Sequence, residues 1–255
     1  GHLSFDRDAR RAAVQGQPQP LEMARQLVDE ELALVHRAES VLTVSAIETA
    51  VFQAAGARQV YLLSHAMETR SHAPDWSHRS GLLFVGAIHP HTPNEDSLLW
   101  FLEHIVPVLR GLEADFPHIS IVGDCTSDKV ARLATGPVRL VGRVDDLTPW
   151  YDRHRVFIAP TRFAAGVPAK VIEAACNGIP VVATPLLVRQ LGWEDGIDIA
   201  SGADAAAFAL AVAALYNDSQ TWTRMCHAMA GRTRAQYATA PFASTLRAAF
   251  GLMKE

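Results

Sequence analysis

The chain has 255 residues, 49% of them hydrophobic, and a formal net charge of −4. This length and apolar content are enough for one large domain, or for one domain plus part of another. The slightly acidic balance excludes bulk electrostatic attraction to nucleic acid or to anionic membranes, so affinity for phosphate has to come from a local site. We therefore expect no nucleic-acid partner.

Cysteine usage and the lack of targeting signals bear on the compartment. Cys125, Cys176 and Cys226 lie far apart, at neither a metal nor a redox spacing, which indicates a reducing compartment. No apolar run approaches the about 20 residues that span a bilayer, and no signal peptide pattern is present. We expect a cytoplasmic protein without a transmembrane segment, with peripheral contact at the inner membrane surface as an alternative.

The first 80 residues predict a small α/β piece followed by a linker. An amphipathic helix is predicted over 21–37, and strands over 40–44 and 59–63. The helix between these strands has Ser45 as its N-cap and Glu48 three residues later. Two strands cannot bury both faces of a sheet. We interpret 1–80 as the remnant of a larger domain plus a polar linker at 71–80, and the chain begins without Met, which leaves room for preceding sequence.

From residue 82 onward, predicted strands alternate with helices. The five strands are short apolar runs at 82–87, 119–123, 138–142, 155–160 and 179–184. The helices between or after them are predicted near 95–109, 129–133, 147–151, 203–216, 219–237 and 242–253. Asn94 is the predicted N-cap of the first of these helices. The alternation is typical of a doubly wound, Rossmann-like parallel sheet with right-handed crossovers.

Glycines and polar residues follow several of these strands. They are Gly86, His89, Gly123, Asp124, Gly142, Arg143, Val144 and Arg162. Ligands of such sheets bind beyond the carboxyl ends of the strands, so we expect these positions to converge on one rim. For any single glycine, an ordinary strand-to-helix turn is the alternative interpretation.

The segment from Arg155 to Thr184 predicts a strand, a loop, a short helix and a strand. Gly166 allows a close backbone approach to a ligand, Pro168 suits the first helical position, and Gly178 marks the helix end. The start of such a helix offers unpaired N–H groups and the positive end of the helix dipole. Both favour an anion such as a diphosphate.

Lys170 and Glu173 are the informative side chains of this helix. Lysine in the first turn lies at the unfavourable end of the dipole, and Lys170 before Glu173 is the weaker order for a helical pair. An external anion explains the lysine, and Arg162 adds a planar second donor. Glu173 has acceptors for both hydroxyls of a ribose. The alternative is an exposed Lys–Glu pair worth a few tenths of a kcal/mol on an ordinary crossover helix. Val171, Ala174 and Ala175 are predicted to form the core face of the helix, opposite Lys170, Glu173 and Asn177.

The motifs FVGAIHPHTPN, ISIVGD, VRLVGRVDDLTPWYD and RVFIAPTRFAAGVPAKVIEAACNGIPVVAT follow one another in order. In this order and spacing, the run 81–242 resembles the C-terminal, donor-binding domain of the GT-B-fold, retaining glycosyltransferases of family 4. The stretch HRAESVLTVSAIE resembles the end of that family's N-terminal, acceptor-binding domain. The resemblance implies that 1–80 is a remnant of that domain plus linker and that 81–255 is the donor-binding domain with its C-terminal helices.

The resemblance also implies roles for particular residues. Glu173 would bind the donor ribose, and Arg162 and Lys170 would hold the diphosphate and act in catalysis. The other donor-binding positions would be Gly86, Arg143, Val144, Gly166 and Val167, with the backbone near Arg143 and Val144 facing the base. The implied reaction transfers a sugar, with retention, from a nucleoside-diphosphate-sugar to a carbohydrate, lipid or protein acceptor, without a metal or another cofactor.

Two departures from the family pattern keep alternatives open. Ala165 stands where many members have a glutamate that contacts the sugar, and the loop after the first strand lacks a basic residue that is often found there. We expect the 255 residues to be incomplete for catalysis. A degenerate, non-catalytic nucleotide-sugar module or scaffold is one alternative, and a sugar-nucleotide epimerase is another. No G-x-G-x-x-G follows a predicted strand and no P-loop is present, which excludes an oxidoreductase of the Rossmann type.

Overall fold

The computed structural model describes residues 11–14, 16, 29, 30, 32–112 and 117–252. Contacts divide the chain into two compact units. Unit 1 contains Gly1–Glu68, Arg162–Pro168 and Ala235–Glu255, and unit 2 contains Thr69–Thr161 and Ala169–Arg234.

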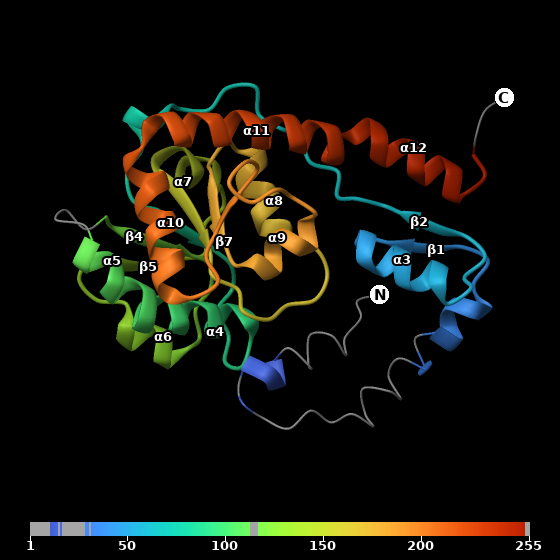
Figure 1. Ribbon diagram of the computed structural model, residues 1–255, viewed down its shortest axis with the longest axis horizontal. Coiled ribbons are helices and arrows are strands. Elements are labelled where there is room, and N and C mark those ends of the chain that lie inside the picture. The colour runs from blue at the N-terminus through green and yellow to red at the C-terminus, as the bar shows by residue number, and fades with distance from the viewer. Residues whose placement is uncertain (1–10, 15, 17–28, 31, 113–116, 253–255) are drawn as a thin grey trace. The chain divides into compact units, whose positions relative to one another are not determined.

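Unit 2 is built on a six-stranded parallel sheet (Figure 1). Its strands are β3 (Leu82–Val85), β4 (Ile119–Val122), β5 (Val138–Gly142), β6 (Val156–Ala159), β7 (Val181–Ala183) and β8 (Ala200–Ser201). Their order across the sheet is β5-β4-β3-β6-β7-β8, and Leu82 of β3 pairs with Ile119 on one side and Val156 on the other. The chain therefore moves outward from β3 in one direction and then returns to its other side. The predicted doubly wound parallel sheet is confirmed.

Helices cover both faces of this sheet. On one side are α4 (Pro93–Trp100), a π-helix (Phe101–Ile105), α5 (Val106–Leu112), α6 (Asp128–Leu133) and α10 (Ala205–Asn217). On the other side are α7 (Thr148–Arg153), α8 (Ala169–Cys176) and α9 (Pro185–Leu191). Helix α11 (Ser219–Tyr237) contacts the backbone just before β6 and β7 through Trp222 and Cys226. Right-handed crossovers require this division, because the chain reverses its direction across the sheet after β5.

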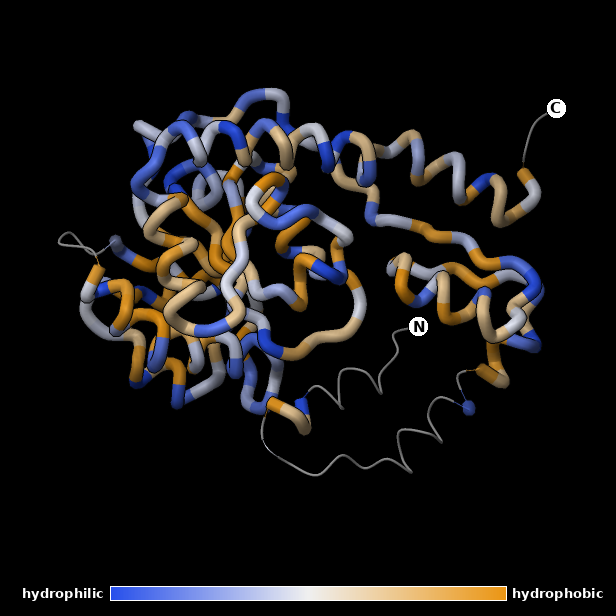
Figure 2. The backbone as a smooth tube through the Cα atoms, in the orientation of Figure 1, coloured by the Kyte–Doolittle hydropathy of each residue, from blue (hydrophilic) through white to orange (hydrophobic). Residues whose placement is uncertain are grey.

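The strands of unit 2 are buried on both faces. All four residues of β4 and of β6 are buried, and these strands read as apolar runs with little alternation. Figure 2 shows this concentration of hydrophobic residues along the central strands. Full burial of a side chain such as Phe84 or Ile158 contributes about 1.5–3 kcal/mol, so the sheet is a rigid platform for the loops at its edges.

The helix after β3 differs from the prediction in two ways. Its N-cap is Thr92, whose Oγ1 accepts from the N–H of Glu95 at 3.4 Å, so the prediction that Asn94 caps this helix is wrong. The expected helix over 95–109 is helical throughout, but it contains a π-helix, in which the Val106 N–H bonds five residues back to the Phe101 carbonyl. Pro107 explains this, since its ring lacks an N–H and would clash with the carbonyl four residues earlier in a regular α-helix.

Three elements of unit 2 were not predicted, namely α9, β8 and a 3-10 helix (Trp76–His78) within the predicted linker. Helix α9 has seven residues and ends at Gly192, which is in the left-handed conformation with φ +65°. The two residues of β8 pair with β7. Elements this short carry almost no periodic signal in a sequence.

Unit 1 contains the predicted strand–helix–strand piece. Strands β1 (Val41–Thr43) and β2 (Val60–Leu62) are parallel neighbours, and α3 (Ala46–Ala54) connects them. Ser45 caps α3 as predicted, accepting from the Glu48 N–H. Helix α12 (Thr239–Ala249) also belongs to this unit. Of the helix predicted over 21–37, residues 29, 30 and 32–37 are helical, and the rest lie outside the described residues.

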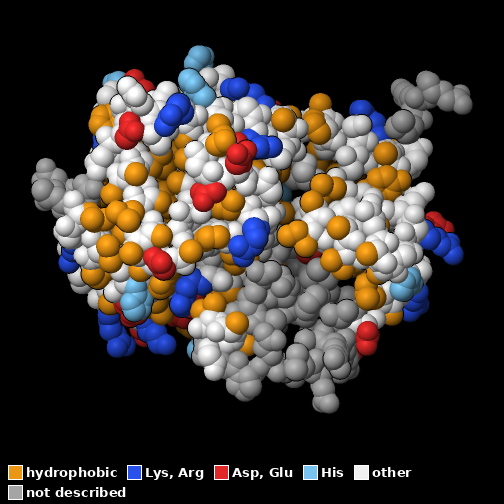
Figure 3. Space-filling model, in the orientation of Figure 1, with side chains coloured by type: hydrophobic (Ala, Val, Ile, Leu, Met, Phe, Trp, Pro, Cys, Tyr) orange, Lys and Arg blue, Asp and Glu red, His pale blue; other side chains and the backbone are white. Residues whose placement is uncertain are grey.

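The surface carries mixed charge. Basic and acidic side chains are interspersed on the face that Figure 3 shows. Within the described ranges, no helix combines the length and the apolarity that crossing a bilayer requires.

Candidate functional site

A cavity of about 340 Å³ lies at the carboxyl ends of β3, β4 and β5. Its lining residues come from the three loops that leave these strands: Val85, Gly86, Ala87, Val122, Gly123, Asp124, Arg143, Val144 and Leu147. Three of the predicted donor-binding residues, Gly86, Arg143 and Val144, therefore line one cavity. Its walls are largely apolar with Arg143 and Asp124 at the lining, which suits a flat, partly polar ring.

Two glycines allow the backbones below this cavity to approach each other. Gly86 has φ +154° and Gly123 has φ +137°, where other residues are strained. A Cβ at Gly86 would lie 2.8 Å from Nδ2 of Asn94, and a Cβ at Gly123 would overlap the Gly86 carbonyl oxygen. The Gly123 N–H also donates to the Gly142 carbonyl at 2.8 Å. Side chains at these positions would both strain the backbone and displace the loops.

The buried carboxylate of Glu95 ties two of these loops together. One of its oxygens accepts from the His91 N–H at 2.7 Å, and the other accepts from the Ser127 hydroxyl at 2.5 Å. Burial by itself would raise the pKa of Glu95, but these two hydrogen bonds hold it below its usual range. Sequence reasoning missed this residue. The pattern Thr92-x-x-Glu95, a capping-box spacing, was the available signal.

Lys170 turns its amine into the protein. Its Nζ donates to Oδ1 of Asn94 at 2.6 Å and lies 4.4 Å from the centroid of the Phe84 ring. Burial lowers the pKa of Lys170 to about 8. Among the described residues, no carboxylate forms an ion pair with this amine, so its charge is held by a neutral amide and a ring face.

This amine lies at the point where the strand order of the sheet reverses. Asn94 is in the first turn of α4, which follows β3, and Lys170 is in the first turn of α8, which comes after β6 in the chain. Because β3 and β6 are neighbours whose crossovers leave in opposite directions, their carboxyl ends flank the crevice in which such sheets bind ligands. The Lys170–Asn94 hydrogen bond connects the first turns of the two helices that follow these strands.

Glu173 lies one turn beyond Lys170 on the partly exposed face of α8, while Val171, Ala174 and Ala175 are buried. The predicted division into a core face and a polar face is confirmed. Burial and the neighbouring Glu173 carboxylate raise the pKa of Tyr151 above its usual range. The Tyr151 hydroxyl is buried and interacts with the Glu173 carboxylate. Tyr151 is a second residue near the site that sequence reasoning missed.

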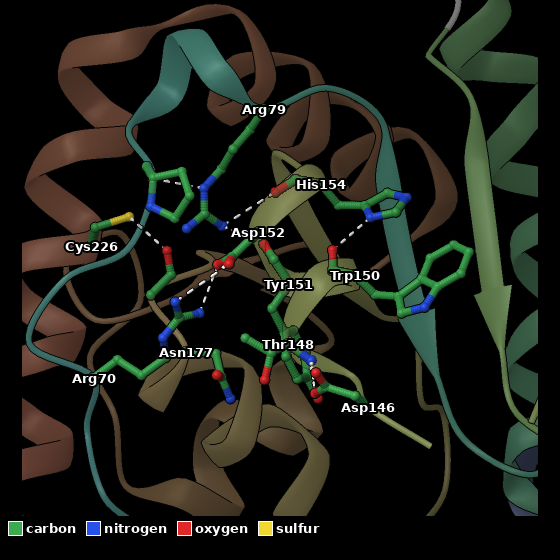
Figure 4. Close-up of polar contacts among 12 residues, drawn as sticks. Arg70, Arg79, Asp146, Thr148, Trp150, Tyr151, Asp152, His154, Asn177 and Cys226 are labelled. Carbon is green, nitrogen blue, oxygen red and sulfur yellow. Dashed lines mark hydrogen bonds and ion pairs between the residues drawn. The ribbon is translucent and has the colours of Figure 1, made fainter. Parts of the chain in front are cut away.

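Helix α7, which carries Tyr151, is held by two arginines (Figure 4). The buried guanidinium of Arg79 donates to the carbonyl of Tyr151 at 2.6 Å and to that of His154 at 3.3 Å. Arg70 forms an ion pair with Asp152 at 2.6 Å. These contacts satisfy the carbonyls at the end of a six-residue helix that could not persist alone.

The structure leaves part of the predicted site in the other unit. Arg162, Gly166 and Val167 belong to the segment Arg162–Pro168, which groups with unit 1, and their roles stay predictions. Gly166 has φ +76°, and Pro168 directly precedes α8. His89 is exposed, and its Nδ1 lies 2.9 Å from the Thr126 hydroxyl.

Comparisons with known proteins identify one matching family. A family model described as "Glycosyl transferases group 1" matches residues 79–218. No curated protein sequence matches the chain.

Several solved structures share the fold. S. aureus TarM, in a complex that includes UDP, is 14% identical with a TM-score of 0.71, and the match covers 88% of this chain and 46% of that one. Anabaena Alr3699/HepE in complex with UDP is 13% identical with a TM-score of 0.72, covering 96% and 75%. The sucrose-phosphate synthase of Thermosynechococcus elongatus is 16% identical with a TM-score of 0.72, covering 97% and 66%. The chain thus spans about half the length of TarM and up to three quarters of the other two.

Proposed function

Because the chain belongs to the family of group 1 glycosyl transferases, we propose that unit 2 binds the nucleoside-diphosphate-sugar donor of a glycosyl transfer reaction. The observation that carries this proposal is the position of the Lys170 amine. It donates to Asn94, in the helix that follows the Gly86 loop of the cavity, and among the described residues no carboxylate pairs with it.

In this proposal the nucleoside occupies the cavity. The diphosphate lies between the carboxyl ends of β3 and β6, where the strand order of the sheet reverses. The apolar walls contact the base, while Arg143 and the backbone at Val144 supply polar contacts. Glu173 accepts hydrogen bonds from the ribose hydroxyls. Solved relatives include complexes with UDP, so UDP is the first nucleotide to test.

The departing diphosphate gains negative charge as its bond to the sugar breaks. The Lys170 amine and the N-terminus of α8 stabilise this charge more in the transition state than in the ground state, which lowers the barrier. Arg162 is proposed to contribute in the same way. The proposal includes retention of the anomeric configuration, membership of family 4, transfer to a carbohydrate, lipid or protein acceptor, no metal, and a cytoplasmic location. It also includes residues 1–80 as a remnant of the acceptor-binding domain and 81–255 as the donor-binding domain.

Calorimetric titration of the folded protein with UDP, GDP and ADP tests the donor site. We expect one of the three to bind with a sub-millimolar dissociation constant, and Glu173→Ala to weaken it. If none of them binds at millimolar concentration, the proposed donor site is wrong.

Ala165 favours a second candidate, a module that binds a nucleotide-sugar without catalysis, because the family's usual sugar-contacting glutamate is replaced. Donor hydrolysis or transfer separates the two. Turnover of a UDP-sugar that is abolished by Glu173→Ala supports the enzyme, and tight donor binding without turnover supports the module.

A further inference from the structure

The side chain of Asn94 makes two hydrogen bonds in opposite directions. Its Nδ2 donates to the Ala87 carbonyl at 2.8 Å, and its Oδ1 accepts from the Lys170 amine at 2.6 Å. An ammonium group can only donate, and a carbonyl can only accept. The two partners therefore fix the amide orientation, and no flipped arrangement satisfies both of them.

This arrangement holds the Lys170 amine without neutralising it. An aspartate at position 94 could also accept from Lys170, but its negative charge would compensate the amine and repel a phosphate. The amide uses one of the three amine hydrogens, and the Phe84 ring face, 4.4 Å away, stabilises positive charge without using another. The amide therefore leaves the other two amine hydrogens unused.

Asn94 also connects the amine to the cavity. The Ala87 carbonyl that it holds and the adjacent Gly86 both belong to the cavity lining. Gly86 has to lack a side chain partly because a Cβ there would press on Nδ2 of Asn94. The loop that forms one wall of the cavity and the amine at the crevice are thus fixed by the same amide.

From these contacts we propose that Asn94 is a positioning residue for the donor diphosphate: it presents to the phosphates the Lys170 amine, which no carboxylate of the described residues compensates. This proposal rests on the proposed donor site. The new element is that a neutral side chain, Asn94, contributes to recognition of the phosphates rather than of the base.

The test uses Asn94→Asp, with Asn217→Asp as a matched control. Asn217 ends α10 next to Tyr216, whose hydroxyl accepts from the Gly81 N–H just before β3 begins. The control therefore adds the same charge beside the amino ends of the strands, opposite the crevice. Each protein is titrated with UDP and with uridine at pH 7, after circular dichroism and thermal unfolding have shown that it is folded.

We expect Asn94→Asp to weaken UDP binding at least tenfold and uridine binding less than threefold, and Asn217→Asp to change neither. Because a carboxylate beside the amine raises the pKa of Lys170, the decline of UDP affinity above pH 8 should also move to higher pH. A merely structural role of Asn94 would not produce this shift.

A double-mutant cycle with Asn94→Ala and Lys170→Met keeps the proposal testable if the aspartate variant misfolds. We expect Asn94→Ala to weaken UDP binding in the wild-type background and to have no further effect once Lys170 is methionine. UDP binding by Asn94→Asp within twofold of wild type, or additive effects in the cycle, would overturn the positioning role. If wild type binds none of UDP, GDP and ADP, the donor site itself is wrong.

Discussion

Replacing Lys170 by methionine is expected to make the protein more stable while weakening its affinity for a nucleoside diphosphate. Burial moves the pKa of Lys170 from its usual value near 10.5 to about 8. At about 1.36 kcal/mol per pKa unit, keeping this amine charged at pH 7 costs about 3 kcal/mol. Methionine fills a similar volume without charge.

Part of this gain is lost because Oδ1 of Asn94 is left without its donor, which costs about 1–2 kcal/mol. The net expectation is therefore a stabilisation of about 1–2 kcal/mol at pH 7. Losing a charge-assisted hydrogen bond to a phosphate costs about 1.5–3 kcal/mol, so UDP affinity should fall by about 10- to 100-fold.

The pH dependence of stability independently tests whether Lys170→Met stabilises the protein. Between pH 8 and 10.5 the unfolded chain binds more protons at Lys170 than the folded chain does, so wild-type stability rises with pH over this window. The stability advantage of Lys170→Met should therefore shrink by about 2 kcal/mol between pH 7 and pH 10. Urea unfolding at both pH values measures it.

Lys129→Met is the matched control, because Lys129 is exposed on α6. It should change stability by less than about 0.5 kcal/mol at either pH. A Lys170→Met protein that is less stable than wild type by more than 1 kcal/mol, or whose difference from wild type is the same at both pH values, would refute the reasoning.

Three further predictions concern other parts of unit 2. Glu173→Gln should weaken UDP about tenfold, since a carboxylate loses its charge-assisted hydrogen bonds from the ribose, and it should have little effect on 2′,3′-dideoxy-UDP; equal losses for the two nucleotides would contradict the ribose role. Gly123→Ala should lower the free energy of unfolding by about 2 kcal/mol or more in urea titrations, because its Cβ would overlap the Gly86 carbonyl, whereas an effect under 0.5 kcal/mol would mean that the loops relax freely. Burial lowers the pKa of His154 from 6.5 to about 4, so the unfolded chain binds more protons than the folded chain between these pH values. The free energy of unfolding should therefore fall by about 3 kcal/mol as the pH drops from 6.5 to 4. His154→Gln should reduce this loss, and an unchanged pH profile in that variant would refute the prediction.

Much of the fold was predictable because its strands show as apolar runs in the sequence and its main helices end at or near residues that commonly terminate helices. The sheet class followed from the alternation of these elements, as the pairing of β3 with both β4 and β6 confirms. Irregular and very short elements were less predictable. The π-helix depends on Pro107, whose effect does not appear in the spacing of apolar residues, and β8 is recognisable only through its pairing with β7.

The candidate site was predicted to the extent that unusual residue types reveal it. Lys170 was informative because the helix dipole disfavours it, and its amine does turn inward. Asn94 was predicted to be an N-cap, because an asparagine near the start of a helix is typical of a cap. In the structure Thr92 is the cap and Asn94 binds Lys170. Glu95 and Tyr151 were missed because their partners lie on other loops or helices, and contacts between distant segments leave no local pattern.

The π-helix of unit 2 has a consequence for how this segment tolerates changes in length. A π-helix is an α-helix that has gained one residue, and here Trp100 and Phe101, just before and at its start, pack edge-on against Phe208 of α10. Deleting one residue between 102 and 105 would restore regular winding only if Pro107 were replaced as well, because its ring needs the widened turn. Insertions and deletions in this helix should therefore occur together with loss of that proline. Each such change should rotate the aromatic residues that contact α10 by about 100° around the helix axis, relative to the part of the helix beyond the change.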